Sequence, residues 1–338
     1  MNKLLIICGA TATGKTDLGI SLAQKFNGEI VSADSRHIYK GMDIGTGKDI
    51  PQESEPLTDH PLDEKFKKIN KNFSAVYRLR NAIPIWLIDA VNPDYRFNLA
   101  DYFRLTRLVI KDICQRNRLP VVVGGTGLYI KALITQLHLI NIPPDIKLRN
   151  KLSRLTLSDL QQSLQKINPE KWKIMNESDR QNGRRLVRAI EIAQCKNNHL
   201  IGQLSADWRM LYLYSDLPSL YKKIDDRVEK RVKQGIVNEI RILLGRGYSF
   251  DLPSFSAIPY RLFKSYFIGA QSEQELHKII DRWKYEEHAL ARRQITWFKK
   301  MVKQYNPEQI FEVDVTSISP NQKIGKQVAK WYTKKNNA

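Results

Sequence analysis

Several residue patterns that would place this chain of 338 residues in a familiar class are scarce or missing. Its three cysteines lie far apart and form no Cys-x-x-Cys pair, so the sequence indicates neither a disulfide framework nor a cysteine metal site. No apolar run approaches the roughly 20 residues that cross a bilayer. The run Leu4–Cys8 is too short for the core of a signal peptide. We therefore expect a cytoplasmic protein with reduced, buried thiols and no membrane partner.

Acidic residues are also in short supply. The chain has 55 Lys and Arg residues against 35 Asp and Glu residues, a net charge of +20. Residues 1–60 hold six basic and eight acidic residues, so the rest of the chain holds 49 basic residues against 27 acidic ones. Solvated lysine-rich faces would explain this surplus. Charge alone slightly favours a second explanation, a nucleic acid bound away from the N-terminal segment.

Short apolar runs alternate with segments of helical spacing. The expected strands are Leu4–Cys8, Glu29–Ala33, Pro84–Ile88, Pro120–Val123 and Leu211–Tyr214, and the expected helices are Asp17–Phe26, Leu99–Arg116, 217–247 and 272–303. This alternation predicts a parallel α/β sheet, whose ligands bind beyond the carboxyl ends of the strands. Three polar clusters follow such strands and should share one edge: Gly9–Thr16, Asp34-Ser35 and Gly124–Thr126.

Three segments depart from this pattern. Residues 50–85 are polar, contain several prolines and lack a clean period, which favours an insertion or a mobile loop. Residues 141–204 show helical spacing and predict an inserted helical domain, with 1–140 and 205–315 forming the α/β domain. Residues 316–338 read as a basic tail, frayed from Lys323.

The stretch Gly9-x4-Gly14-Lys15-Thr16 has the spacing of a P-loop between a strand and a helix. In such a loop the backbone amides surround a diphosphate or triphosphate, Lys15 adds positive charge, and the Thr16 hydroxyl can bind Mg²⁺. The predicted phosphate-binding residues are Gly9, Ala10, Thr11, Ala12, Thr13, Gly14, Lys15 and Thr16. The fold class is therefore P-loop NTPase-like: a parallel sheet flanked by helices, with an inserted and mostly helical domain.

A P-loop does not by itself specify the chemistry. An enzyme that hydrolyses nucleotides also needs an aspartate after an apolar strand. Asp34 and Asp89 both have that position, and the residues alone do not separate them.

Six segments in order resemble the tRNA dimethylallyltransferase family, also called tRNA isopentenyltransferases. They are GATATGKT, SADSRHIYKGMDIGTGKD, GGTGLYIKAL, NGRRLVRAIEI, IDDRVEKRVKQGIVNEIRILLGRGY and RRQITWFKK. The similarity spans about residues 4–300, and the second and last segments are highly specific to the family. No Cys/His zinc finger follows Lys300, so the chain resembles the bacterial members.

The resemblance implies transfer of a dimethylallyl group from dimethylallyl diphosphate to N6 of an adenosine in tRNA, with Mg²⁺ as cofactor. That adenosine lies next to the anticodon on its 3′ side, and diphosphate is released. The resemblance implies that Asp34 is the general base, while Lys15 and Arg227 offset the charge of the leaving diphosphate. We expect a monomer whose partner is the tRNA anticodon stem-loop.

Residues that match the tRNA-contacting elements of the family come from both predicted domains. They are Asp34, Ser35, Arg36, His37, Thr126, Arg149, Arg184, Arg185, Arg188, Tyr260, Arg261, Arg292, Arg293 and Gln294. Plainer roles compete with some of these. Arg227 can pair with Asp226 or Glu229 on a surface helix, and Arg188 can pair with Glu191. For Trp297 and Phe298 we favour core packing over base stacking.

The chain departs from the family at three motif positions. Ala10 replaces a proline, Arg36-His37 replaces a pair that is usually uncharged, and Pro259 stands where the family favours glycine. Three other functions compete with tRNA prenylation: prenylation of free adenosine phosphates, a small-molecule P-loop kinase, and a non-catalytic RNA-binding protein. The basic helical region and the RRQITWFKK segment argue against the first, because a small substrate needs neither. A kinase leaves the net charge of +22 outside residues 1–60 unexplained, and the intact Lys15, Thr16, Asp34 and Arg227 argue against the third.

Overall fold

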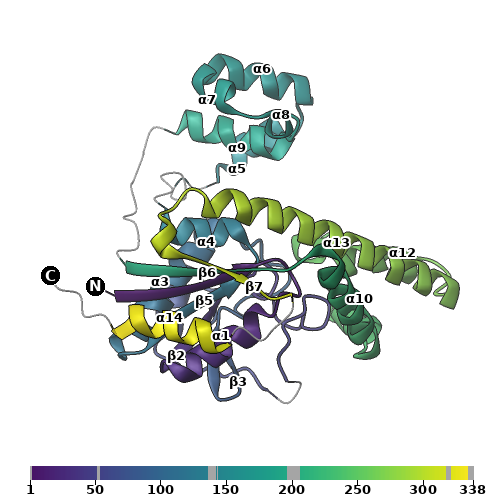
Figure 1. Cartoon of the computed structure of the whole chain (residues 1–338). Helices are drawn as coiled ribbons and strands as arrows, with labels where there is room; N and C mark the ends of the chain where they lie inside the picture. Colours follow the sequence, from purple (N-terminus) through teal and green to yellow (C-terminus); the bar gives the residue numbers. More distant parts are fainter. Residues whose placement is uncertain are drawn as a thin grey trace. The chain divides into compact units, whose positions relative to one another are not determined.

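The computed structural model describes residues 2–51, 54–135, 142, 144–195, 206–316 and 321–333. The chain divides into two compact units, Met1–Ile134 with Leu204–Ala338, and Thr135–Gln203 (Figure 1). The second unit overlaps the predicted helical insertion, whose predicted boundaries at 140 and 204 lie outside the described residues. None of the described helices combines the length and apolarity needed to cross a membrane.

A sheet of seven strands forms the centre of the larger unit. The strands are β1 (Asn2–Gly9), β2 (Gly28–Ser32), β3 (Tyr77–Arg80), β4 (Ile83–Trp86), β5 (Leu119–Gly124), β6 (Ala206–Tyr214) and β7 (Ile310–Asp314). Their order is β3-β4-β2-β5-β1-β6-β7, and every neighbouring pair except β3 and β4 is parallel. The central strands β2 and β5 are buried along their whole length, as expected for strands covered by helices on both faces. The predicted parallel α/β class is therefore confirmed.

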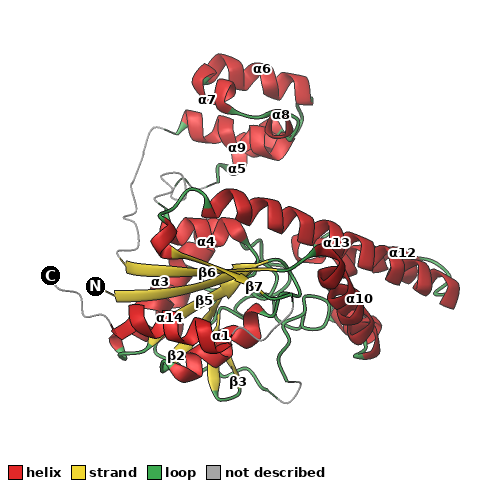
Figure 2. Ribbon diagram, viewed as in Figure 1, coloured by secondary structure: helices red, strands yellow, loops and turns green. Residues whose placement is uncertain are grey.

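Helices cover both faces of this sheet (Figure 2). The helices of the larger unit are α1 (Lys15–Lys25), α2 (Leu62–Ile69), α3 (Leu99–Gln115), α4 (Gly127–Ile134), α10 (Leu217–Lys233), α11 (Ile236–Gly245), α12 (Ile258–Ile268), α13 (Glu273–Val302) and α14 (Asn321–Thr333), with 3₁₀ turns at Pro253–Ser256 and Pro307–Gln309. Helices α1 and α14 lie on one face, and α4 and α13 lie on the other (Figure 1). The single helix predicted over 217–247 is two helices, because Gly235 adopts a φ of 95° between them.

The segment 50–85 is folded over its described residues, 50–51 and 54–85, which corrects the prediction of a mobile loop. It contains α2 and β3, and β3 pairs antiparallel with β4. Phe66 and Phe73 are buried, and the ring of His60 packs edge-on against Trp86 with centroids 4.8 Å apart. The segment contributes few apolar residues to the core, so its sequence lacks the period by which a helix or strand is recognised.

The C-terminal segment is a packed helix over Asn321–Thr333, so the prediction of a frayed tail is wrong there. Ile324, Val328 and Trp331 are buried in the core cluster that includes the apolar face of α1. The Trp331 indole donates to Asp207 Oδ2 at 2.8 Å, and Lys3 Nζ donates to the Trp331 carbonyl at 2.6 Å. The many lysines favoured the prediction of a frayed tail, but Ile324, Val328 and Trp331 follow the spacing of an amphipathic helix.

The smaller unit is entirely helical in its described part. Its helices are α5 (Ile146–Leu152), α6 (Leu157–Ile167), α7 (Pro169–Ile174), α8 (Glu177–Arg180) and α9 (Gly183–Gln194). Its core is built mainly by α6 and α9, through buried residues such as Leu160, Leu164, Leu186 and Ile190. A capping box between Thr156 and Asp159 begins α6.

Candidate active site

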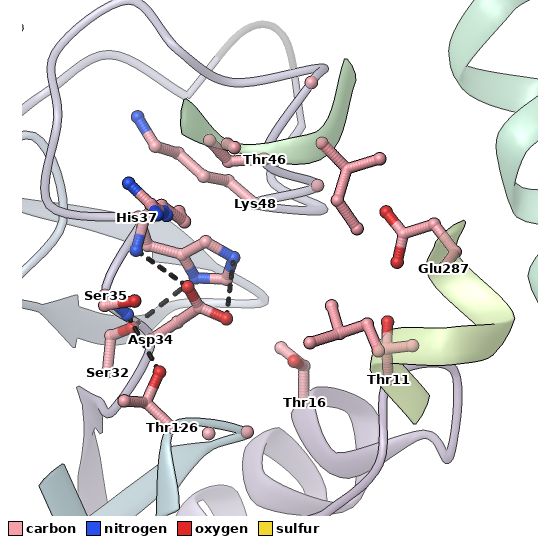
Figure 3. Close-up of a pocket in the computed structure, with 18 of the residues that line it drawn as sticks. Thr11, Thr16, Ser32, Asp34, Ser35, His37, Thr46, Lys48, Thr126 and Glu287 are labelled. Atoms are coloured by element: carbon pink, nitrogen blue, oxygen red, sulfur yellow. Dashed lines mark hydrogen bonds and ion pairs between the residues drawn. The ribbon is translucent and has the colours of Figure 1, made fainter. Parts of the chain in front are cut away.

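The three polar clusters that the sequence placed on one edge lie together. Because β2, β5 and β1 are neighbours and run in the same direction, their carboxyl ends bring Asp34, Gly124 and the P-loop to one place. A cavity of about 500 Å³ opens there, and residues of α10 and α13 complete its wall. Figure 3 shows Asp34 and Thr16 on opposite sides of this cavity.

The P-loop has the backbone that phosphate binding requires. Gly9 has a φ of 151°, and a Cβ there would lie 2.3 Å from the Leu213 carbonyl oxygen, so only glycine fits. Gly14 is left-handed, with a φ of 76°, and α1 begins directly after it at Lys15. The Thr13 hydroxyl donates to the Ala10 carbonyl at 2.8 Å and fixes the turn. Ala10 is buried against Leu220 of α10, so the loop accommodates the change from proline. A helix N-terminus with inward-turned amides is a site for anions.

Two cations converge on this loop. Lys15 Nζ donates to the Ala10 carbonyl, and burial, followed by the charge of Arg227, lowers the pKa of Lys15 to about 8. Arg227 reaches across from α10, where one guanidinium nitrogen donates to Thr11 Oγ1 at 3.0 Å and another donates to the Gly47 carbonyl at 2.9 Å. Its carboxylate partner is Asp49, rather than either acidic neighbour on its own helix.

Asp34 is held at the end of β2 as a carboxylate. Its Oδ1 accepts the backbone N–H of Arg36 at 2.8 Å. The backbone N–H of Ser35, which lies between these two residues, donates to Thr126 Oγ1 at 3.1 Å. Thr126, which the sequence predicted as a tRNA contact, therefore joins the loops that follow β2 and β5. Burial raises the pKa of Asp34, but the nearby His37 ring and the Arg36 amide outweigh that effect, and the net pKa is lowered. An ionised Asp34 is able to accept a proton from a group in the cavity.

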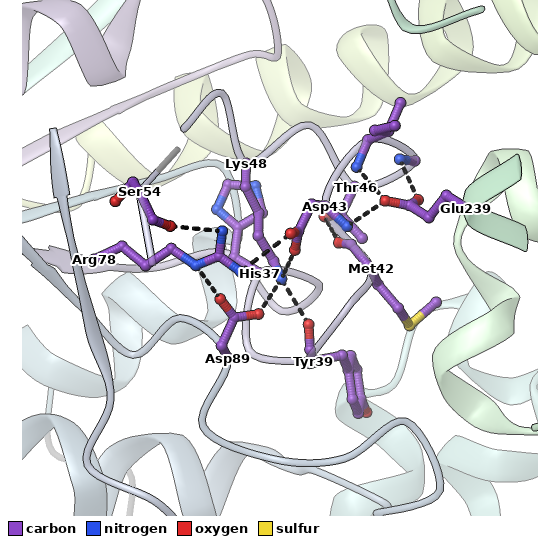
Figure 4. Close-up of polar contacts among 12 residues, drawn as sticks. His37, Tyr39, Met42, Asp43, Thr46, Lys48, Ser54, Arg78, Asp89 and Glu239 are labelled. Atoms are coloured by element: carbon purple, nitrogen blue, oxygen red, sulfur yellow. Dashed lines mark hydrogen bonds and ion pairs between the residues drawn. The ribbon is translucent and has the colours of Figure 1, made fainter. Parts of the chain in front are cut away.

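Asp89, the other aspartate that the sequence left open, serves a structural role. It is 2% exposed, and its carboxylate lies 2.5 Å from both Lys48 Nζ and Arg78 Nε. Figure 4 shows Lys48 also bonded to the Tyr39 carbonyl, at 2.6 Å, and to Asp43. These contacts anchor the loop that runs from His37 to Asp49 along the cavity. Asp89 does not line the cavity, so of the two aspartates only Asp34 borders it.

The RQITWF segment, Arg293–Phe298, lies on α13 and supports the P-loop. Gln294 Oε1 accepts the Thr11 N–H at 2.8 Å, while Gln294 Nε2 donates to the Gly125 carbonyl at 3.0 Å. The predicted tRNA contact Gln294 is thus engaged by the protein itself. Arg293 lines the cavity, whereas Arg292 lies outside it and donates to the Tyr221 hydroxyl at 2.8 Å.

The two aromatic residues of this segment differ in environment. Phe298 is fully buried, as predicted, but Trp297 is 42% exposed, and the prediction of core packing is wrong for it. The Trp297 indole covers Gly127, where a Cβ would lie 2.1 Å from Nε1. Consecutive helical residues point about 100° apart, so one of the pair is buried and the other is not.

Tyr260 also departs from its predicted role. It is fully buried, with no exposed face for tRNA, and its hydroxyl donates to Glu239 Oε1 at 2.7 Å. The neighbouring Arg261 does line the cavity and pairs with Glu286. Pro259 lies in the first turn of α12, where helical N–H groups have no intrahelical partner, so the helix tolerates it.

The remaining predicted arginines fall into two groups. In the larger unit, Arg36 lines the cavity and donates to the Pro253 carbonyl at 3.1 Å and to Ser256 Oγ at 3.0 Å. In the smaller unit, Arg149 and Arg188 both pair with the buried Glu191, which confirms the plainer alternative for Arg188. The other two arginines of this unit are Arg184 and Arg185.

Arg185 pairs with Asp179, whereas Arg184 is exposed and has no ion-pair partner within the described part of the chain. Arg184 is therefore the member of this group best placed to meet an external anion.

Two residues outside the predicted site set, Arg231 and Glu239, also shape the surroundings of the cavity. Arg231 is 4% exposed, lines the cavity and lies 3.4 Å from Glu287, and burial lowers its pKa to about 10. Its spacing from Arg227 put both on one helix face, which is the signal that points to it. Glu239 has no comparable signal, because its partners are backbone amides of a distant loop.

A divalent cation has few protein ligands here. Among the residues that the structure describes, no group of three His, Cys, Asp or Glu side chains is arranged to hold a metal. The Thr16 hydroxyl lines the cavity beside Lys15. Mg²⁺ commonly keeps several waters and takes one or two protein ligands together with substrate phosphates, so this donor set suits it.

Known protein families and relatives match nearly the whole chain. A family model described as IPP transferase matches residues 76–301, and one described as isopentenyl transferase matches residues 2–68. A tRNA dimethylallyltransferase of Roseiflexus sp. (strain RS-1) is 39% identical over 310 residues, covering 89% of this chain and 91% of the relative. One of Geotalea uraniireducens is 33% identical over 300 residues, covering 88% and 89%.

Solved structures show the same fold. The full-length tRNA isopentenylpyrophosphate transferase of Bacillus halodurans is 31% identical, with a TM-score of 0.64, and the match covers 98% of this chain and 96% of that one. A eukaryotic dimethylallyltransferase, described as acting on tRNA, matches with a TM-score of 0.76 at 24% identity, covering 97% and 78%.

Proposed function

We propose a function for this chain from the fact that it belongs to the IPP transferase family. It transfers the dimethylallyl group of dimethylallyl diphosphate to N6 of the adenosine that follows the anticodon in tRNA, and it releases diphosphate. The observation that carries this proposal is one cavity with an anion-binding loop on one side and the carboxylate of Asp34 on the other.

Different residues bind the diphosphate, offset its charge and accept the proton. The loop amides and Lys15 hold the diphosphate, and Arg227, which donates to Thr11, adds charge where the C1–O bond breaks. N6 of adenine attacks C1, and Asp34 takes the proton that N6 releases. Thr16 would hold Mg²⁺, which supplies further charge compensation for the diphosphate.

The tRNA contacts fall to the cations that the protein does not consume internally. Arg293 borders the cavity, and Arg184 is exposed on the smaller unit. Arg261 also borders the cavity, but it pairs with Glu286. Extruding a target base from a single-stranded loop costs a few kcal/mol, and contacts of the base in the pocket offset that cost. The cytoplasmic location and monomeric state stay predictions.

Labelled dimethylallyl diphosphate tests the proposal directly. The protein is incubated with Mg²⁺, the labelled donor, and either tRNA or AMP, and the nucleic acid is then digested to find the labelled nucleoside. We expect label on a tRNA adenosine only. Asp34→Asn should slow transfer by about 10²–10⁴-fold, because it removes the proton acceptor and keeps the side-chain shape.

Asp251→Asn is the matched control, since Asp251 is 84% exposed and lies outside the cavity. Label on AMP would instead assign the chain to free-nucleotide prenylation. Hydrolysis of ATP with no transfer would assign it to the P-loop kinases and ATPases.

A further inference from the structure

His37 lines the cavity next to the proposed base, and it has been assigned only as a predicted tRNA contact, with no part in the chemistry. Its Nε2 lies 3.9 Å from Asp34 Oδ2, and its Nδ1 lies 3.4 Å from Ser32 Oγ (Figure 3). The side chain is 18% exposed, so it touches both the carboxylate and solvent. The backbone holds it there, because the His37 carbonyl accepts the Asp89 N–H at 3.1 Å.

We propose that His37 and Asp34 act as a carboxylate–imidazole pair, in which His37 Nε2 receives from Asp34 the proton that N6 of adenine releases. This inference rests on the proposed function. The N6–C1 bond forms as the C1–O bond breaks, and diphosphate leaves with the electron pair of that bond. The proton moves from N6 to Asp34 Oδ2, then to His37 Nε2, and finally to solvent.

The geometry favours this direction of transfer. His37 Nδ1 faces Ser32 Oγ and Nε2 faces Asp34. In the tautomer that carries its proton on Nδ1, the Nε2 lone pair is available to receive the proton. Imidazole is a stronger base than a carboxylate, so the proton resides on His37 after transfer. A separation of 3.9 Å is longer than a hydrogen bond, but catalytic contacts of this kind commonly tighten when substrate binds.

The charges around the ring keep it neutral at physiological pH. Burial lowers the pKa of His37 first, and Lys48 and Arg227 lower it further, while Asp34 and Asp49 raise it. The net result is a pKa below the usual 6.5. Because only neutral imidazole accepts a proton, the pair works above that pKa and fails as the pH falls through it.

Single-turnover rates between pH 5 and pH 9 test the pair. Enzyme and donor are saturating, so that the chemical step is observed. The wild-type rate should fall tenfold per pH unit below the pKa of His37. His37→Gln keeps an amide of similar size without a titrating group, so its rate should drop about tenfold at neutral pH and its acid limb should move to lower pH.

His277→Gln is the matched control, because His277 is 72% exposed on α13 and lies outside the cavity. It should retain the wild-type profile. A His37→Gln enzyme with the wild-type rate and the wild-type acid limb overturns the inference. If no pH gives labelled tRNA with the wild-type protein, the proposed function has failed instead.

Histidine NMR titration decides the pair without any reaction. The His37 resonance is assigned by its loss in His37→Gln, and its pKa is measured in the wild type and in Asp34→Asn. Removing the Asp34 charge should lower the pKa of His37, because Asp34 raises it. An identical pKa in both proteins means that the two side chains are not coupled, and the inference falls.

Discussion

Replacing Glu239 tests how the cavity loop is supported. The Glu239 carboxylate accepts the backbone N–H groups of Asp43, Ile44 and Gly45 at 2.8, 2.7 and 3.0 Å, as well as the Tyr260 hydroxyl at 2.7 Å. Glu239→Ala removes all four bonds at once. Glu239 is partly exposed, so water replaces it in part, and about 1 kcal/mol for each bond gives a loss of about 4 kcal/mol in the free energy of unfolding.

Tyr260→Phe removes one of these bonds and should cost about 1 kcal/mol. Urea unfolding followed by tryptophan emission reports mainly the larger unit, because Trp172 is the only one of the six tryptophans in the smaller unit. Glu273→Gln serves as a control, since Glu273 is 89% exposed and should change stability by less than about 0.5 kcal/mol.

Amide hydrogen exchange adds a local readout. In Glu239→Ala, the amides of residues 43–45 should exchange faster, while those of the central strands should follow the change in global stability. If Glu239→Ala unfolds within 1 kcal/mol of the wild type and the exchange at 43–45 is unchanged, then the carboxylate does not support this loop and the reasoning is refuted.

Three further changes have expected outcomes. Asp89→Asn removes the buried carboxylate that Lys48 and Arg78 share and leaves both cations with only the partly exposed Asp43 as a partner, so it should destabilise the protein by about 3–5 kcal/mol in urea unfolding, whereas Asp251→Asn should not. Diphosphate affinity measured by calorimetry should weaken as the pH rises through about 8, because Lys15 then loses its charge, and Lys15→Arg should remove that component. The logarithm of tRNA affinity should fall linearly with the logarithm of salt concentration, and a flat response would contradict phosphate contacts by the basic surface.

The sequence predicted those parts of the fold and site that depend on local pattern. Buried strands such as Pro120–Val123 stand out as apolar runs, and their alternation with helices fixes a parallel sheet. The P-loop follows from glycine positions and from the Lys15-Thr16 pair. A polar residue directly after a parallel strand is placed at the ligand-binding edge, which left both Asp34 and Asp89 as candidates, and the family resemblance selected Asp34.

The parts that the sequence did not predict depend on contacts between distant segments. Whether Asp34 or Asp89 faces the cavity is decided by Lys48 and Arg78, which neutralise Asp89 from other parts of the chain. Tyr260 looked like an RNA contact, but its hydroxyl is used by Glu239. Residues 50–85 and α14 bury only a few apolar side chains each, and a weak pattern of that kind is masked by neighbouring charge.

The bond from Lys3 to the end of α14 has a practical consequence for experiments. Asn2 begins β1, whereas the P-loop follows its far end, and seven residue steps along a strand separate the two by about 23 Å. Lys3 binds the carbonyls of Trp331 and Tyr332, so Thr333 lies at that same remote edge. An affinity tag or a surface tether attached beside Asn2 or Thr333 therefore starts at the edge of the sheet remote from the P-loop.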